Sequence, residues 1–68
     1  MYTLKINGME KEFANLPSTL VELLDEMEIN HATIVAEIDG EIISRDNFHQ
    51  TPINANQQIE LIRFVGGG

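Results

Sequence analysis

The residues best suited to chemistry in this 68-residue chain are its last three, Gly66, Gly67 and Gly68. Glycine has no side chain to bury and the greatest backbone freedom of any residue, so three in a row do not serve packing. When extended they form a thin tether of about 10 Å, at roughly 3.3–3.6 Å per residue, that ends in a carboxylate. Such a tether fits a narrow channel in another protein, but the same residues are typical of a frayed terminus or a linker. The tail alone supports both interpretations equally.

The other reactive side chains form no catalytic or metal-binding pattern. His31 and His49 have no second His or Cys at ligand spacing, and the chain has no cysteine, so it offers neither a thiolate nor a disulfide. The eleven acidic residues are spread as on a solvated surface. Gly8 and Gly40 are isolated turn residues, not a phosphate-binding loop. We therefore predict surface histidines, no catalytic residue, no metal site and no cofactor bound by the chain itself.

The formal net charge of −7 limits the classes of partner. It repels phosphate backbones and anionic membrane surfaces, so we expect no nucleic acid and no membrane partner, whereas it suits a basic protein surface. No apolar run approaches the roughly 20 residues of a membrane span, and the start lacks the basic and apolar regions of a signal peptide. We expect a cytoplasmic protein.

The pattern along the chain predicts strands joined by tight turns. Alternating or β-branched residues indicate five strands, at 2–7, 9–13, 33–38, 41–44 and 58–65. Asn7-Gly8 and Asp39-Gly40 tolerate the positive φ of a tight turn, so they predict two antiparallel hairpins. The last strand is apolar on both faces, as in the middle of a sheet. The polar stretch 45–56 is expected to be a loop with a helical turn anchored by Phe48.

The clearest helix signal starts at Thr19. Its hydroxyl can accept from the amide of Glu22, and the Glu22 side chain can reach back to Thr19, as in a capping box. An apolar stripe at helical spacing follows: Leu20, Leu23, Leu24 and Met27. Asn30 fits the left-handed residue that ends a helix, and we expect Glu26 and Glu28 to weaken the last turn because they oppose the helix dipole.

A helix between two hairpins must cover one face of a mixed sheet, and the final strand returns to the centre beside the first. This predicts an α+β fold, a β-grasp (ubiquitin-like) roll with about five strands in a mixed sheet and one main helix packed on one face. Residues 1–65 form the β-grasp domain, and residues 66–68 form a flexible C-terminal glycine tail. The predicted core consists of Leu4, Ile6, Phe13, Leu20, Leu23, Leu24, Met27, Ile34, Ala36, Ile59 and Leu61.

Four blocks carry a resemblance to a known family. They are Ile6-Asn7-Gly8, Thr19-Leu20-Val21-Glu22-Leu23-Leu24, Val35-Ala36-Glu37-Ile38-Asp39-Gly40-Glu41-Ile42-Ile43 with Arg45 behind it, and Ile59-Glu60-Leu61-Ile62-Arg63-Phe64-Val65-Gly66-Gly67-Gly68. In this order and spacing they resemble the ThiS family, the sulfur carrier proteins of thiamin biosynthesis, over the whole chain. One departure is Asn54-Ala55-Asn56-Gln57, where the family usually has a Gly-Asp turn, although Asn can supply the same geometry.

The resemblance implies a carrier that is a substrate of enzymes and not itself an enzyme. In such carriers the terminal carboxylate, here that of Gly68, is adenylated by a ubiquitin-activating-like adenylyltransferase with ATP and Mg²⁺. It is then converted to a thiocarboxylate, with sulfur from a cysteine desulfurase or similar donor, and delivers the sulfur to thiazole synthase. By the same resemblance Gly66 and Gly67 thread through the active sites of the partners.

Partner binding is expected at Phe64, Ile62 and Arg63, the apolar and charged groups nearest the tail. The alternatives are that the loop holding Phe48 covers Ile62 and Phe64, and that Arg63 is an ordinary solvated residue. Two other functions also stay open: a related ubiquitin-like carrier for molybdopterin or tRNA thiolation, and a non-catalytic β-grasp interaction module with incidental glycines. The chain length and the ending from Phe64 to Gly68 favour the thiamin carrier over the usually longer molybdopterin carrier.

Overall fold

The computed structural model describes residues 1–64. Val65 and the predicted glycine tail, residues 66–68, lie outside the described residues, so the domain boundary at residue 65 and the flexibility of the tail stay predictions. The elements are β1 (Tyr2–Ile6), β2 (Met9–Phe13), α1 (Leu20–Glu26), the 3-10 helix η1 (His31–Thr33), β3 (Ile34–Ile38), β4 (Glu41–Ile43), the 3-10 helix η2 (Arg45–Gln50) and β5 (Gln58–Arg63). Within residues 1–64 the helices are all too short or too polar to cross a membrane.

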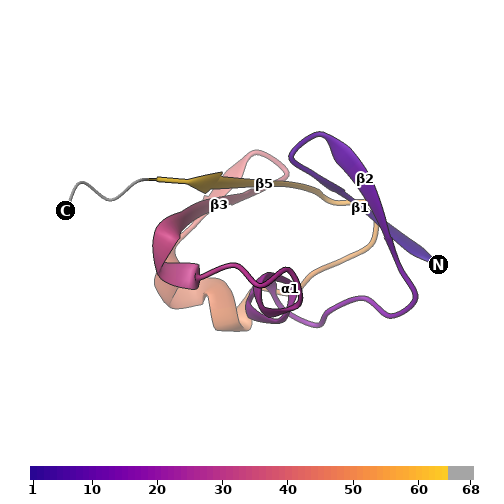
Figure 1. The fold of residues 1–68 in the computed structure, drawn as a ribbon, viewed down its shortest axis with the longest axis horizontal. Helices are drawn as coiled ribbons and strands as arrows, with labels where there is room; N and C mark the ends of the chain where they lie inside the picture. The colour runs from indigo at the N-terminus through magenta and orange to yellow at the C-terminus, as the bar shows by residue number, and fades with distance from the viewer. Residues whose placement is uncertain (65–68) are drawn as a thin grey trace.

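The five strands form one mixed sheet in the order β2-β1-β5-β3-β4. β5 runs parallel to β1 and antiparallel to β3, and the two hairpins β1–β2 and β3–β4 flank it on either side. Figure 1 shows α1 on one side of this sheet, with the chain entering β5 from the right and leaving it at the left. The predicted placement of the last strand in the centre beside the first is confirmed.

Both hairpin turns have the conformation that their dipeptides predict. Asn7 and Gly8 have φ values of 51° and 81°, and Asp39 and Gly40 have 50° and 87°. Two consecutive left-handed residues define the type I′ turn, whose twist matches that of the flanking strands. The turns therefore fix the register of both hairpins.

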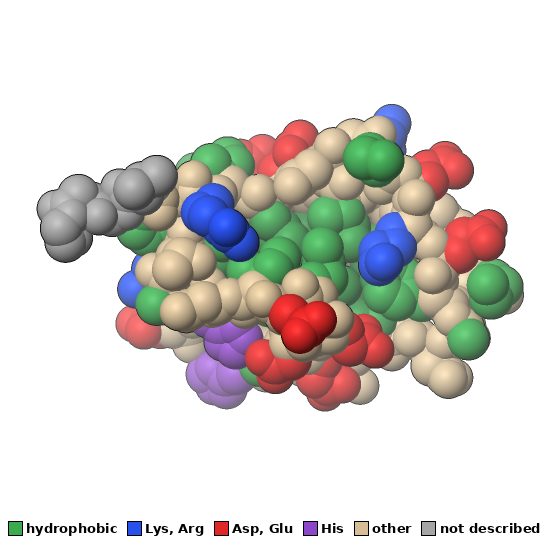
Figure 2. Space-filling model, in the orientation of Figure 1, with side chains coloured by type: hydrophobic (Ala, Val, Ile, Leu, Met, Phe, Trp, Pro, Cys, Tyr) green, Lys and Arg blue, Asp and Glu red, His purple; other side chains and the backbone are tan. Residues whose placement is uncertain are grey.

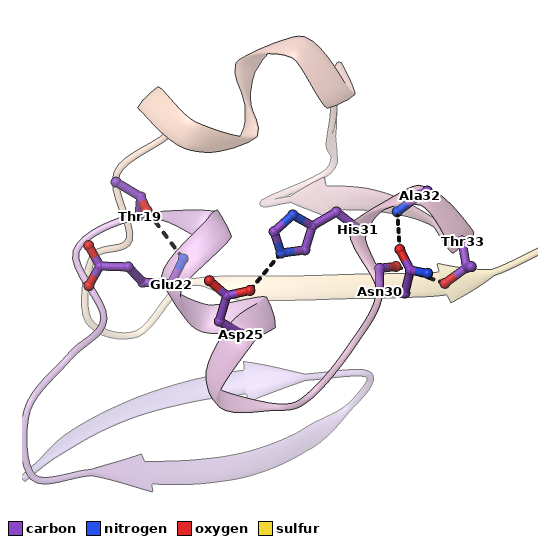
Figure 3. A network of polar contacts seen from close by, with 7 residues as sticks. All are labelled: Thr19, Glu22, Asp25, Asn30, His31, Ala32 and Thr33. Carbon is purple, nitrogen blue, oxygen red and sulfur yellow. Dashed lines mark hydrogen bonds and ion pairs between the residues drawn. The ribbon is translucent and has the colours of Figure 1, made fainter.

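The start of α1 is capped nearly as predicted. The Glu22 amide donates to Thr19 Oγ1 at 3.3 Å, as Figure 3 shows. The Glu22 carboxylate, however, accepts from the amide of Ser18 at 3.3 Å and not from that of Thr19. The capping interaction therefore reaches one residue further back along the chain than the sequence suggested.

The end of α1 differs from the prediction, because the left-handed residue is Glu28, with a φ of 57°. The Glu28 amide donates to Asp25 O at 3.1 Å and the Ile29 amide to Leu24 O at 2.9 Å, which is the hydrogen-bond pattern of a Schellman motif. Asn30 has a φ of −73° and caps η1 instead. The prediction that Asn30 ends the helix is wrong.

The core lies between α1 and the sheet and contains every predicted residue except Met27, which is only partly buried. It also contains Ile38, Phe48 and Ile53. Phe48 is 2% exposed and belongs to η2, so the predicted helical turn anchored by Phe48 is confirmed. The segment after η2 is fastened to the start of α1, since the Leu20 amide donates to Thr51 O at 2.9 Å.

Candidate functional site

β5 leads to Phe64, the last described residue, so its end forms the base from which the predicted tail departs. We call Ile62, Arg63 and Phe64 the tail base. β3 pairs with β5 as far as Arg63, which lies opposite Ile34. One residue further, the Phe64 amide donates to Thr33 O at 3.0 Å. The tail base is thus hydrogen-bonded to the rest of the fold up to the last described residue.

Two turn residues hold β5 with their side chains. Asn7 Oδ1 accepts from the Leu61 amide at 2.7 Å, and Asn7 Nδ2 donates to Leu61 O at 3.3 Å, so the Asn7 amide group substitutes for a strand residue beyond the end of β1. On the other side of β5, the Asp39 carboxylate accepts from the Gln58 amide at 2.9 Å. Sequence reasoning gave Asn7 and Asp39 turn roles only, because their partners are distant in the chain.

The segment that holds Phe64 is itself supported by a local network (Figure 3). The Asn30 side-chain oxygen accepts from the Ala32 amide at 2.9 Å, and the Thr33 hydroxyl donates to Asn30 O at 2.8 Å. Arg45 Nη2 donates to Ala32 O at 3.2 Å, which connects η2 to the same turn. These bonds fix Thr33, whose carbonyl accepts from Phe64.

The two histidines lie on the surface and in separate places. His31 Nε2 is 2.9 Å from Asp25 Oδ1, a partly exposed contact that joins η1 to α1 (Figure 3). His49 is exposed on η2. The prediction of surface histidines is confirmed for both.

Apolar side chains gather on the face of the sheet opposite α1. Ile62 is 54% exposed and lies directly across from Val35. Ile42, on β4, faces the same side because it pairs with Glu37, two residues after Val35. Together with Phe64, which is 41% exposed, they form what we call the outer-face patch: Val35, Ile42, Ile62 and Phe64. Sequence reasoning missed Val35 and Ile42, although the strict alternation with buried Ile34 and Ala36 could have assigned Val35 to this face.

The structure separates the three predicted partner-binding residues. Ile62 belongs to the outer face, whereas Arg63 points to the α1 side and lines a cavity of about 320 Å³ there. Ile62 and Phe64 are 54% and 41% exposed, so the loop that holds Phe48 does not cover them, and that alternative is wrong. Binding at Ile62, Arg63 and Phe64 stays a prediction.

The sheet is mixed and five-stranded, packs against one α-helix, and has its last strand in the centre. This arrangement defines a ubiquitin-like protein of the β-grasp class. The last strand of the described residues, β5, is hydrogen-bonded to β1 on one side and to β3 on the other. The model of the ThiS family matches residues 4–68. The chain therefore belongs to the ThiS family.

Individual relatives agree with this assignment. The sulfur carrier protein ThiS of Bacillus subtilis is 28% identical over 65 residues, which are 96% of this chain and 98% of that protein. A thiazole synthase of Paramagnetospirillum magneticum is 31% identical over 65 residues, 96% of this chain but 20% of that protein. The crystal structure of ThiS from Geobacter metallireducens matches with a TM-score of 0.82 and 28% identity, covering 97% of this chain and 99% of the other. The predicted β-grasp fold is confirmed.

Proposed function

We propose that the chain is a sulfur carrier of thiamine biosynthesis and acts as a substrate of other enzymes. The observation that carries the proposal is the family match, which extends through residue 68 and so includes all three terminal glycines. The similarity to one fifth of a thiazole synthase supports the thiazole pathway over molybdopterin synthesis or tRNA thiolation. The ATP on which the activation depends suits a cytoplasmic location.

The proposed chemistry takes place at the carboxylate of Gly68. A carboxylate is a poor acyl donor until one oxygen becomes part of a good leaving group. An adenylyltransferase supplies that group when the carboxylate attacks the α-phosphorus of Mg²⁺-bound ATP, which releases pyrophosphate and forms an acyl adenylate. Hydrosulfide then attacks the acyl carbon and displaces AMP, which leaves with one carboxylate oxygen, so that a thiocarboxylate remains. The chain has no cysteine, so its own side chains offer no thiol to carry the sulfur.

The fold supports this role by holding the base of the tail. Gly66 and Gly67 would thread through the active site of each partner, where a Cβ would clash, while β5 stays paired on both sides. The outer-face patch offers a partner apolar surface at the end of β5, where Ile62 and Phe64 are exposed. A small patch of this kind suits a contact that forms and breaks with each transfer.

Intact-mass measurement tests the proposal. The full chain is incubated with a ThiS-activating adenylyltransferase, MgATP and sodium sulfide. We expect the mass increase of one oxygen exchanged for sulfur, on a C-terminal peptide that contains Gly68, and no increase without ATP. A variant that lacks Gly68 is the matched control and should stay unmodified.

The proposal fails if the variant lacking Gly68 gains the same mass, or if the full chain stays unmodified while the Bacillus subtilis carrier is thiolated in the same mixture. Adding a thiazole synthase with its other substrates should then return the carrier to its original mass. If only a molybdopterin-forming or tRNA-thiolating enzyme does so, the carrier chemistry stands and the thiazole pathway is wrong.

A further inference from the structure

β2 is an edge strand whose outer side has no neighbouring strand among residues 1–64. All its residues except Phe13 are exposed. Met9 and Lys11 pair with the buried residues Ile6 and Leu4, so they face the α1 side, whereas Glu10 and Glu12 face the opposite side. β2 therefore presents apolar and basic groups toward α1 and acidic groups on the outer face.

The backbone of β2 is open to a further strand. The two-residue turn at Asn7-Gly8 makes Ile6 and Met9 a hydrogen-bonded pair. Because such pairs alternate along an antiparallel ladder, the N–H and C=O groups of Glu10 and Glu12 point away from β1. The register with β1 is continuous and β2 contains no proline, so neither a bulge nor a missing donor interrupts this edge.

A hollow lies beside this edge, between the β1–β2 hairpin and α1. It has a volume of about 340 Å³ and is lined by Ile6, Asn7, Met9, Glu10, Lys11 and Met27. It adjoins the cavity lined by Arg63, since Asn7 and Met27 line both. Figure 2 shows a face of the molecule on which hydrophobic side chains are exposed between basic ones, with acidic side chains below them. A strand added to β2 would direct every second side chain toward this hollow.

The charges of β2 define the residues that would fit opposite them. Opposite charges across a strand pair are favourable, and like charges directly opposite are unfavourable. The residue opposite Lys11 should be acidic, those opposite Glu10 and Glu12 basic, and those opposite Met9 and Phe13 apolar. We propose that β2 binds an extended segment of a partner protein by strand addition, and that this segment reads apolar–basic–acidic–basic–apolar.

A second copy of the chain does not fit this edge. Antiparallel pairing of two β2 strands centred on Lys11 would place Lys11 opposite Lys11 and Glu10 opposite Glu12. Centring on Glu10 or on Glu12 would place that residue opposite itself. Each of these registers puts like charges directly across from one another, so the edge charges disfavour self-association and select a partner of another sequence. The proposal is independent of sulfur carriage.

NMR titration with a designed peptide tests this surface. The probe is the capped peptide Val-Arg-Asp-Arg-Val, added to the ¹⁵N-labelled full chain up to millimolar concentration. The proposed segment runs antiparallel to β2, so that each arginine of the peptide pairs with the outward-facing N–H and C=O groups of Glu10 or Glu12 directly opposite. We expect shifts in Met9–Phe13 and Met27, slower hydrogen exchange of the Glu10 and Glu12 amides, and no shift at the outer-face patch. The charge-inverted peptide Val-Glu-Lys-Glu-Val should bind at least tenfold more weakly.

Two further comparisons separate strand addition from simple charge attraction. N-methylation of both arginines in the peptide removes the donors that face the edge and should abolish binding, whereas N-methylation of the aspartate, which faces away, should not. The wild-type chain should prefer the original peptide, with Asp opposite Lys11, to Val-Arg-Lys-Arg-Val. Lys11→Glu should reverse this preference and bind Val-Arg-Lys-Arg-Val at least about threefold more tightly than the original peptide. Because Lys11 is exposed, the dispersed spectrum of the variant checks that it folds.

The proposal is overturned if no shift occurs at millimolar peptide, if the shifts fall on the outer-face patch, or if the charge-inverted or arginine-methylated peptides bind equally well. It is also overturned if Lys11→Glu keeps the preference of the wild-type chain.

Discussion

Replacing Asn7 should reveal how firmly β5 is held. Asn7 makes two hydrogen bonds to the backbone of Leu61 and also has a φ of 51°, so its side chain and its backbone contribute separately. Asn7→Gly removes the hydrogen bonds but keeps a residue that adopts positive φ freely. Asn7→Ala removes the bonds and also forces an L-residue with a Cβ into the left-handed region. The difference in the free energy of unfolding between the two variants therefore measures the cost of the left-handed backbone conformation for a residue with a Cβ.

The two bonds set the size of the effect. Each bond contributes a net ~1 kcal/mol to stability. Without the Asn7 side chain, the N–H and C=O groups of Leu61 that face it would be partly buried and unpaired. Asn7→Gly should therefore lower the free energy of unfolding by about 1–3 kcal/mol. Asn7→Ala should lose a further ~1–2 kcal/mol through strain. At the usual stability per residue, the whole free energy of unfolding of a 68-residue chain is about 3–10 kcal/mol. Asn7→Ala therefore removes a large share of it.

Urea unfolding followed by circular dichroism measures these changes. With an m-value of ~1 kcal/mol/M for a domain of this size, the midpoint should fall by about 1–3 M for Asn7→Gly. Asp39→Gly is the matched control, because Asp39 occupies the same turn position but accepts only one exposed bond. Asp39→Gly should lower the free energy of unfolding by less than ~1 kcal/mol. The reasoning is refuted if Asn7→Gly stays within about 0.5 kcal/mol of the wild type, or if the glycine and alanine variants are equally stable.

Three further predictions concern other residues. Ile62→Ser and Phe64→Ser should each raise the KM of the adenylyltransferase for this chain about tenfold. Both should change the free energy of unfolding by less than about 0.5 kcal/mol. Tyr2→Ser, also at an exposed apolar residue, is the control and should leave KM unchanged. An unchanged KM in the first two variants would exclude the outer-face patch as the docking surface. Glu28→Gly should stabilise the chain by ~1 kcal/mol, because glycine suits the left-handed position and the substitution removes an acidic group from the helix C-terminus. Thermal unfolding measures this, and a lower Tm than that of the wild type would contradict it. Thr19→Ala should cost ~1 kcal/mol in urea unfolding through the lost cap, and no loss would mean that the cap bond contributes nothing.

The elements that were predictable from sequence are those with a local cause. The two hairpins follow from Asn7-Gly8 and Asp39-Gly40, since these dipeptides are among the few that adopt consecutive left-handed conformations. The end of α1 was not predictable in this way. Glu28 is an unfavourable left-handed residue, and its conformation is accepted because the Schellman hydrogen bonds and the packing of Ile29 on the core compensate for it.

The tail base was only partly predictable for a similar reason. The exposure of Ile62 and the opposite orientation of Arg63 follow from the two-residue period of a strand. The supports of this strand do not, because Asn7 lies 54 positions before Leu61 and the Thr33 carbonyl meets Phe64 only after β3 and β5 have paired. Contacts of this kind depend on the register between distant segments, which a local pattern does not contain.

The central position of β5 also governs the order in which the molecule is assembled. Each hairpin can form early from neighbouring residues, but the two share no edge until β5 inserts between them. That insertion brings Lys5 beside Gln58 and closes a loop of more than fifty residues, so it pays the largest entropic cost of the sheet and should limit the folding rate. Because β5 follows the other four strands in the chain, it also emerges after them during synthesis. A chain interrupted before β5 would keep two unjoined hairpins and expose its apolar core to quality control.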